Sequence, residues 1–142
     1  MALSVDITKH LSGFDLHVSF TVEKSNEVLA LLGPSGCGKS MTLKCIAGIV
    51  KPDSGRIVLN DRVLFDSEAH VNVPPQERRV GYLFQNYALF PHMSVYENIA
   101  FPLRLKKLSK DIIDEKVRYY VHLVQLDQHI FKKPAQLSGG QK

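Results

Sequence analysis

The chain has 142 residues, the length of one ordinary domain, and its 44% hydrophobic and 23% charged residues are typical of a globular protein. The lysines and arginines behind its net charge of +4 are interleaved with acids, so we do not expect a nucleic-acid-binding surface. The two cysteines, Cys37 and Cys45, fit neither a metal site nor a disulfide framework and are typical of a reducing cytoplasm. No signal peptide is expected at residues 1–6, and no apolar run approaches the ~20 residues of a membrane helix.

The first 24 residues predict a β-hairpin. Apolar residues alternate with polar ones in two sets: Leu3, Val5 and Ile7, then Leu16, Val18, Phe20 and Val22. This period of two is typical of half-buried strands, and Ser12-Gly13 supplies turn residues between them. We therefore expect two antiparallel strands joined at that turn.

The next stretch, Gly33-Pro34-Ser35-Gly36-Cys37-Gly38-Lys39-Ser40, fits the pattern G-x-x-x-x-G-K-[ST] at every fixed position. The apolar run 28–32 before it predicts a buried parallel strand, and residues 41–50 after it predict a helix packed on that strand. A strand, a glycine loop and a helix form the context in which this pattern binds phosphate. We expect an anion cradle made of backbone amides and the positive end of the helix.

The residue types in this loop assign it a chemistry. The glycines at 33, 36 and 38 let backbone amides approach an anion closely. Lys39 would reach the β- and γ-phosphates of a nucleotide, and the Ser40 hydroxyl would ligate Mg²⁺, a hard ion that prefers oxygen. The sequence thus predicts a site for a nucleotide and its magnesium ion.

Residues 52–85 predict more strands and one long loop. Pro52-Asp53-Ser54-Gly55 is a turn cluster, and it is followed by expected strands at 57–59 and 63–65 with a hairpin turn at Asn60-Asp61. Residues 66–79 are polar and predict a surface loop. A short apolar strand is expected at 80–84, and it ends at Gln85.

The chain becomes helical after Gln85. Ser94-Val95-Tyr96-Glu97 is a capping-box pattern that predicts the start of a short helix, which Pro102 should limit or kink. Ser109 opens a second predicted helix. Its apolar face carries, at three- and four-residue spacing, Ile113, Val117, Tyr120, Val121 and Val124.

Three motifs in this order resemble the nucleotide-binding subunits of ATP-binding-cassette transporters: the loop at 33–40, Gln85, and Leu137-Ser138-Gly139-Gly140-Gln141. The last motif selects this family among phosphate-loop proteins. The resemblance covers essentially the whole chain and implies an α/β fold. This fold has a P-loop NTPase (RecA-like) core with an N-terminal antiparallel β subdomain, in about residues 1–85, and a helical subdomain, in about 86–142, with the C-terminal part of the domain missing.

The resemblance also implies roles and partners. Gln85 matches the family's glutamine that approaches Mg²⁺ and the attacking water, so Gln85 and Lys39 are the expected catalytic residues, and Ser40 and Gln85 the expected metal ligands. Ser138, Gly139, Gly140 and Gln141 match the signature that caps the γ-phosphate of ATP on another subunit. The implied partners are a second nucleotide-binding subunit in a head-to-tail dimer and a transmembrane permease subunit, at the cytoplasmic face of the cell membrane.

Two further contacts are implied near these motifs. The family stacks adenine on an aromatic ring near the first strands, where this chain has Leu11, which cannot stack as a ring does, and Phe14 three residues later. The region 86–103 resembles the surface that meets the permease's coupling helix. Its candidates, for which local packing is the alternative role, are Tyr87, Leu89, Phe90 and His92.

The cargo follows from kinship alone, because the ATPase subunit does not bind it. Residues 60–67 and 74–85 resemble molybdate importers most closely, which implies an oxyanion such as molybdate. Sulfate, polyamine and sugar importers share much of the same pattern.

The family continues after the signature with an apolar strand ending in Asp-Glu and, later, a histidine that contacts the γ-phosphate. Neither follows Lys142, so we expect an N-terminal fragment that exposes apolar sheet edges and hydrolyses ATP very weakly or not at all. Two alternatives stay open: a nucleotide-binding module that does not hydrolyse ATP, and a cassette ATPase that acts on DNA or ribosomes.

Overall fold

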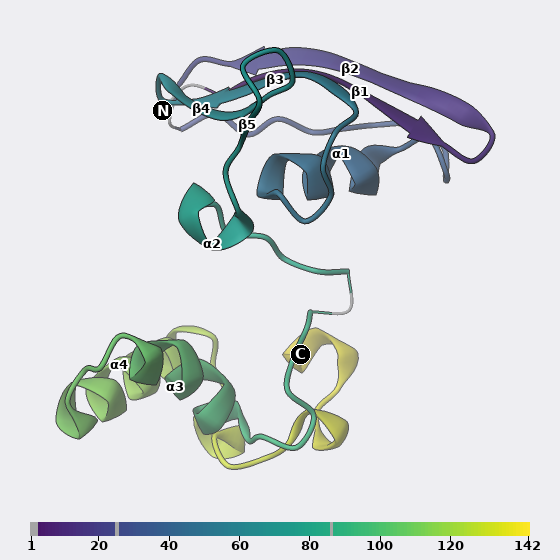
Figure 1. The fold of residues 1–142 in the computed structure, drawn as a ribbon. Helices are drawn as coiled ribbons and strands as arrows, with labels where there is room; N and C mark the ends of the chain where they lie inside the picture. The colour runs from purple at the N-terminus through teal and green to yellow at the C-terminus, as the bar shows by residue number, and fades with distance from the viewer. Residues whose placement is uncertain (1–2, 25, 86) are drawn as a thin grey trace. The chain divides into compact units, whose positions relative to one another are not determined.

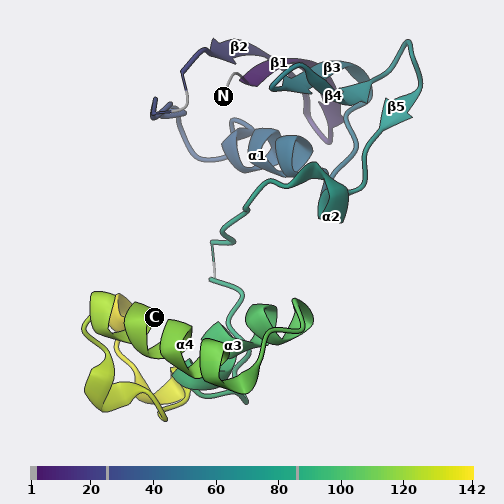
Figure 2. The same ribbon diagram turned by 90° about the vertical axis from the view of Figure 1, so that its left-hand side faces the viewer.

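The computed structural model describes residues 3–24, 26–85 and 87–142, and the chain forms two compact units, Met1–Tyr82 and Leu83–Lys142 (Figure 1). The first unit contains a five-stranded sheet in the order β2-β1-β3-β4-β5, in which every pairing is antiparallel. Its strands are β1 (Leu3–Leu11), β2 (Phe14–Val22), β3 (Ser54–Leu59), β4 (Arg62–Asp66) and β5 (Val71–Asn72). The helix α1 (Lys39–Ala47) runs along one face of this sheet (Figure 2).

The predicted hairpins of the first unit are confirmed. β1 and β2 pair from Leu3 opposite Val22 to Leu11 opposite Phe14, with the turn at residues 12–13. The β3–β4 hairpin turns at Asn60 and Asp61, whose φ angles of 50° and 63° are those of the tight turn that matches the twist of the two strands. Turn residues therefore account for both hairpins and period-two alternation for the β1–β2 pairing, whereas the register of β3–β4 shifts between Ile57 and Val58.

The core of the first unit lies between α1 and the sheet. Cys45 and Ile46 of α1 form one buried cluster with side chains of the sheet, and these are Val5, Ile7, Ile57, Leu64 and Phe65. Burial of such side chains is the main favourable term in the stability of the unit. The helix that follows the glycine loop is therefore anchored to the sheet by Cys45 and Ile46, with Met41 packed against the same cluster.

The parallel strand predicted at 28–32 and the short apolar strand predicted at 80–84 are not formed. Both segments lie outside the strands of the described part of the chain, and Val28, Leu32 and Leu83 are 95%, 89% and 76% exposed. An extended segment becomes a strand only when its N–H and C=O groups pair with a neighbouring strand. The five described strands pair only with one another, so these two apolar runs stay outside the sheet.

The predicted loop at 66–79 also differs from the structure. It contains β5, which pairs with Phe65 and Asp66 of β4, and the single-turn helix α2 (Pro75–Arg78). Pro75 occupies the first helical position, where the missing N–H of proline costs nothing. Neither β5 nor α2 is long enough to show a hydrophobic period, so the sequence pattern does not predict them.

The second unit is helical. Its main helices are α3 (Val95–Leu105) and α4 (Lys110–Leu123), followed by three 3-10 turns, η1 (Asp127–His129), η2 (Pro134–Gln136) and η3 (Gly139–Gln141). The capping box at Ser94 and Glu97 and the helix start at Ser109 are confirmed. In the described residues, no helix is long and apolar enough to cross a membrane.

Pro102 does not end α3 at once, and the apolar face of α4 is narrower than predicted. Pro102 lies inside α3, which continues to Leu105. The proline removes one backbone hydrogen bond, but the buried Ala100 and the partly buried Leu103 keep the helix packed. On α4 only Ile113, Val117 and Val121 are buried. Tyr120 and Val124, which were expected on the same face, are 47% and 57% exposed, since α3 covers a single row of α4 side chains.

Candidate functional site

The glycine loop at 33–40 leads directly into α1. Gly38 is the N-cap with a φ of 96°, and α1 begins at Lys39. The first turn of α1 contains no acidic residue, whereas Lys44 lies in the last turn and complements the negative end of the helix dipole. The unpaired N–H groups at the start of this nine-residue helix, together with the exposed loop, therefore favour an anion.

The loop is shaped by its contact with β2. Leu16 of β2 is 6% exposed and packs on Gly38, where an added Cβ would lie 2.6 Å from its Cδ1 atom. Gly36 has a φ of 85°, a conformation that other residues adopt only with strain. The glycines of the pattern are thus required by close packing at 38 and by backbone conformation at 36.

Lys39 turns back over the loop. Its Nζ atom donates to the carbonyl oxygens of Gly33 and Pro34, each at 2.7 Å, and lies 3.4 Å from Sγ of Cys37. Ser40, the next residue of α1, is exposed. The loop therefore gathers one cation, a hydroxyl and the start of a helix in one place.

A hollow beside the loop is lined by residues Phe14–His17 of β2 and Pro34–Cys37. Phe14 is 42% exposed and contributes the aromatic ring of this lining. Leu11 is paired opposite Phe14 in the hairpin. Of the two candidate regions for an adenine contact, Phe14 is the residue that lines the hollow next to the loop.

The other predicted site residues belong to the second unit. Gln85 is exposed in a turn. Ser138 precedes η3, and its backbone N–H donates to Oε1 of Gln141 at 3.0 Å. Gly139 and Gly140 are exposed, and a Cβ on either would meet open space, so packing within the chain does not require glycine there.

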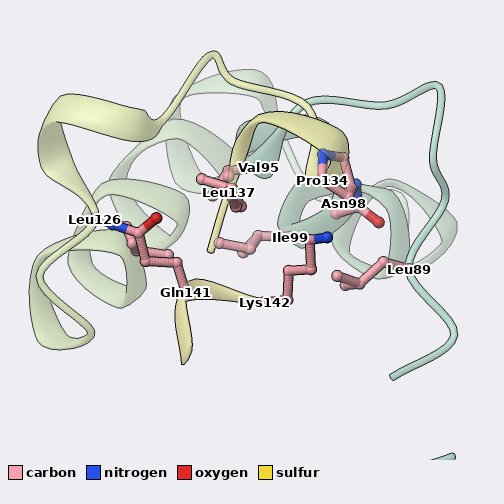
Figure 3. Close-up of a pocket in the computed structure, with 9 residues that line it drawn as sticks. All are labelled: Leu89, Val95, Asn98, Ile99, Leu126, Pro134, Leu137, Gln141 and Lys142. Carbon is pink, nitrogen blue, oxygen red and sulfur yellow. The ribbon is translucent and has the colours of Figure 1, made fainter. Parts of the chain in front are cut away.

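A pocket in the second unit brings the signature close to the predicted coupling surface. Gln141 of the signature and Leu89 line the same pocket, together with side chains of α3 and the η turns (Figure 3). Phe90 packs on Phe101 of α3, with ring centroids 4.8 Å apart. Tyr87 and His92 are exposed.

Two structurally important residues were missed. Asn98 of α3 donates to the carbonyls of Phe90, Met93 and Ser94 and accepts from the Phe90 N–H, so it holds the loop that contains the predicted coupling surface. An asparagine inside a helix is unfavourable unless its amide finds such partners, and that was the available signal. Arg78 is 1% exposed, but it lies in a polar stretch of the sequence, and nothing in that stretch indicates that its side chain is buried.

Comparison with known proteins identifies the family. The ABC transporter family matches residues 16–142. The chain is 56% identical over 119 residues to a spermidine/putrescine import ATP-binding protein of Treponema pallidum, which covers 84% of this chain and 30% of that protein. It is 47% identical over 126 residues to a molybdate/tungstate import ATP-binding protein of Methanocaldococcus jannaschii, which covers 89% of this chain and 40% of that protein.

The fold agrees with this assignment. A solved dimeric ATP-binding cassette in a post-hydrolysis state, bound to ADP and Pi, matches with a TM-score of 0.76 and 25% identity, over 99% of this chain and 65% of that one. The chain spans about a third of the length of the curated relatives it matches. It has the α/β fold of ATP-binding cassettes and belongs to the ABC transporter family.

Proposed function

We propose that this chain is the nucleotide-binding part of an ABC importer subunit and that it binds Mg-ATP at residues 33–40. The observation that supports this most directly is the position of the Lys39 ammonium over a glycine loop that opens a helix. In this proposal Lys39 exchanges its two carbonyl partners for phosphate oxygens. The backbone amides of the loop hold the remaining phosphate charge.

The residues present fit both the nucleotide and its metal ion. Phe14 lines the hollow beside the loop and offers a ring for adenine, while the exposed Ser40 hydroxyl at the start of α1 would hold Mg²⁺. Gln85 is proposed as a further Mg²⁺ ligand from the resemblance of its motif alone. When bound, Mg²⁺ neutralises charge on the β- and γ-phosphates. The protein's own contribution is to keep the phosphates at the start of α1, where Lys39 and the amides face them.

The signature is proposed to complete the site of a second subunit. Gly139 and Gly140 have free space around them, which leaves room for a phosphate to approach the backbone between Ser138 and Gln141. Such a shared site implies a head-to-tail dimer, and dimeric cassettes are among the matching solved structures. A permease subunit that meets the 86–103 region would hold the dimer at the cytoplasmic face of the membrane.

The cargo is proposed to be a small solute. Molybdate is the first to test because residues 60–67 and 74–85 resemble molybdate importers, and one relative is named for molybdate/tungstate. A polyamine is the second, since several relatives are named for spermidine/putrescine. Uptake of labelled molybdate and of labelled spermidine, with and without this gene, separates the two.

The chain by itself is proposed to bind ATP with little or no hydrolysis. Phosphoryl transfer needs a positioned nucleophile as well as charge neutralisation, and the described residues supply the second through Lys39 and the loop. This behaviour would also fit a binding module that does not hydrolyse ATP. Release of phosphate at a rate typical of the family, measured on the pure chain, would contradict it.

The test of the site is Lys39→Ala, measured by titration calorimetry with Mg-ATP. We expect binding to be lost, because the ammonium is the only cation of the loop itself. Lys44→Ala, which removes the same charge from the last turn of the same helix, is the matched control and should bind as the unchanged chain does. Equal affinity of the unchanged chain and Lys39→Ala would refute the assignment.

A further inference from the structure

Arg78 is a buried cation with an unusual set of partners. Its side chain lies in the first unit, 1% exposed, and all three of its nitrogen atoms donate hydrogen bonds. Nη1 donates to the carbonyls of Cys45 and Ile46 at 2.8 and 2.9 Å, Nε donates to the carbonyl of Val73 at 2.7 Å, and Nη2 donates to Oδ1 of Asn72 at 3.0 Å. The acceptors are three backbone oxygens and one amide oxygen, so the charge faces dipoles rather than a carboxylate.

These dipoles explain how the charge is accommodated. Cys45 and Ile46 belong to the last turn of α1, whose carbonyls carry the negative end of the helix dipole. The Cys45 carbonyl also accepts from the N–H of the C-cap residue Gly48, at 3.1 Å. Burial lowers the pKa of Arg78, but a guanidinium remains protonated in proteins. The planar fork of arginine suits several fixed acceptors at once, and lysine offers no such fork.

Arg78 also sits tightly against the end of α1. Gly48 caps α1 with a φ of 80°, and a Cβ at this position would lie 2.5 Å from Nε of Arg78. The same helix that begins at the glycine loop therefore ends against a guanidinium. Arg78 joins this helix end to β5 through Asn72 and to Val73.

We propose that Arg78 is a positioning residue for nucleotide binding, which holds α1 and the segment 72–80 together as one body. This inference rests on the proposed binding of Mg-ATP at the start of α1. A phosphate that fixes the first turn of α1 then also orders its last turn and the segment 72–80. By thermodynamic linkage, loosening this segment weakens the nucleotide.

The variants that test this are Arg78→Met and Arg78→Lys. Arg78→Met fills a similar volume but removes the guanidinium hydrogen bonds to all four acceptors, and we expect Mg-ATP affinity to fall about tenfold, a usual size for coupling between sites. Arg78→Lys keeps the charge without the planar guanidinium fork, and its Mg-ATP affinity should lie between those of the unchanged chain and Arg78→Met. Arg79→Met is the matched control, because the neighbouring arginine is exposed, and its affinity should not change.

A measurement on the unchanged chain keeps the proposal testable if Arg78→Met does not fold. Amide hydrogen exchange is followed by mass spectrometry with and without Mg-ATP. We expect slower exchange in residues 44–50 and 72–80 as well as in the loop. Slowing confined to residues 33–42 would overturn the inference.

Different results would refute the proposed binding of Mg-ATP and the proposed role of Arg78. If the unchanged chain does not bind Mg-ATP, the proposed function is wrong and this inference falls with it. If Lys39→Ala abolishes binding while a folded Arg78→Met binds like the unchanged chain, the proposed function stands and only the role of Arg78 is refuted.

Discussion

The two units of this chain are organised by interactions of very different range. In the first unit β1 pairs with β3, so Leu3 lies opposite Leu59, and the core joins residues of β1, α1 and β4. In the second unit the structure starts from local bonds, such as those between Ser94 and Glu97 and between Ser109 and Ile112. Long-range pairing needs every partner strand to be present, whereas a helix cap needs only its own four residues.

The strongest test of this difference is a cavity in the sheet core. Ile57 is 0% exposed in β3, so Ile57→Ala should lower the free energy of unfolding of the first unit by about 2–5 kcal/mol. The loss should spread over the whole sheet because Ile57 lies opposite both Val5 and Phe65. Urea unfolding followed by circular dichroism measures it.

The matched control for this change is Ile49→Ala. Ile49 is 42% exposed, so the same chemical deletion should cost much less than at Ile57. Equal losses at the two positions would show that α1 and the sheet do not share the core described here.

A local change in the second unit should have a smaller effect. Ser94→Ala removes the cap that accepts from the Glu97 N–H at 3.2 Å, at a cost of about 1 kcal/mol to helix α3. Ser109→Ala should cost less, because its bond to the Ile112 N–H is 3.5 Å long. Loss of helical ellipticity on heating separates the two variants, and a larger loss for Ser109→Ala would contradict the capping account.

The same contrast explains what the sequence could reveal. The caps at Ser94 and Ser109, the turn at Asn60-Asp61 and the glycine loop depend on residues within a few positions of one another, and all were predicted from pattern alone. The sequence could not show that residues 28–32 do not form a strand, because strand formation depends on partner strands elsewhere in the chain.

The candidate site divides along the same line. The glycines and Lys39 belong to a contiguous motif and were identified from it. Arg78 was not, because its four acceptors come from α1, β5 and Val73, which are 5 to 33 positions away in the sequence. For the adenine contact the sequence offers both Leu11 and Phe14, and of these two it is Phe14 that lines the hollow beside the loop.

The hairpin turn offers a smaller and oppositely signed test. Asp61 has a φ of 63°, a region that costs most side chains roughly 1–2 kcal/mol and glycine almost nothing. Because Asn-Gly is the preferred pair in this turn, Asp61→Gly should raise the stability of the first unit by about 0.5 kcal/mol, and Asp61→Val should lower it. Urea midpoints of the two variants measure the effect, and a stabilising valine would contradict this turn geometry.

The smallest effect, and the finest comparison, concerns one carboxylate in each unit. Hydrogen bonds from Lys9 and from the His10 N–H lower the pKa of Asp53, and hydrogen bonds from the Ser94 backbone and side chain lower the pKa of Glu97. A carboxylate with a lowered pKa stabilises the fold above the ordinary carboxyl pKa, and this contribution is lost as the pH falls through the lowered value. Asp53→Asn and Glu97→Gln should therefore each weaken their unit at neutral pH and matter little in acid.

Salt should then separate the two carboxylates. Asp53 is joined to Lys9, 44 residues away, by an ion pair of 2.8 Å. The side chain of Asp53 is 36% exposed and that of Lys9 is 21% exposed, so added salt screens the pair. Glu97 is held mainly by the Ser94 N–H, a local bond of 2.7 Å to a neutral donor, and the charges of Arg104 and Lys133 contribute less to its lowered pKa. In urea unfolding at neutral pH, raising the sodium chloride concentration should shrink the effect of Asp53→Asn more than that of Glu97→Gln. Equal salt dependence would mean that the long-range and the local carboxylate stabilise their units in the same way.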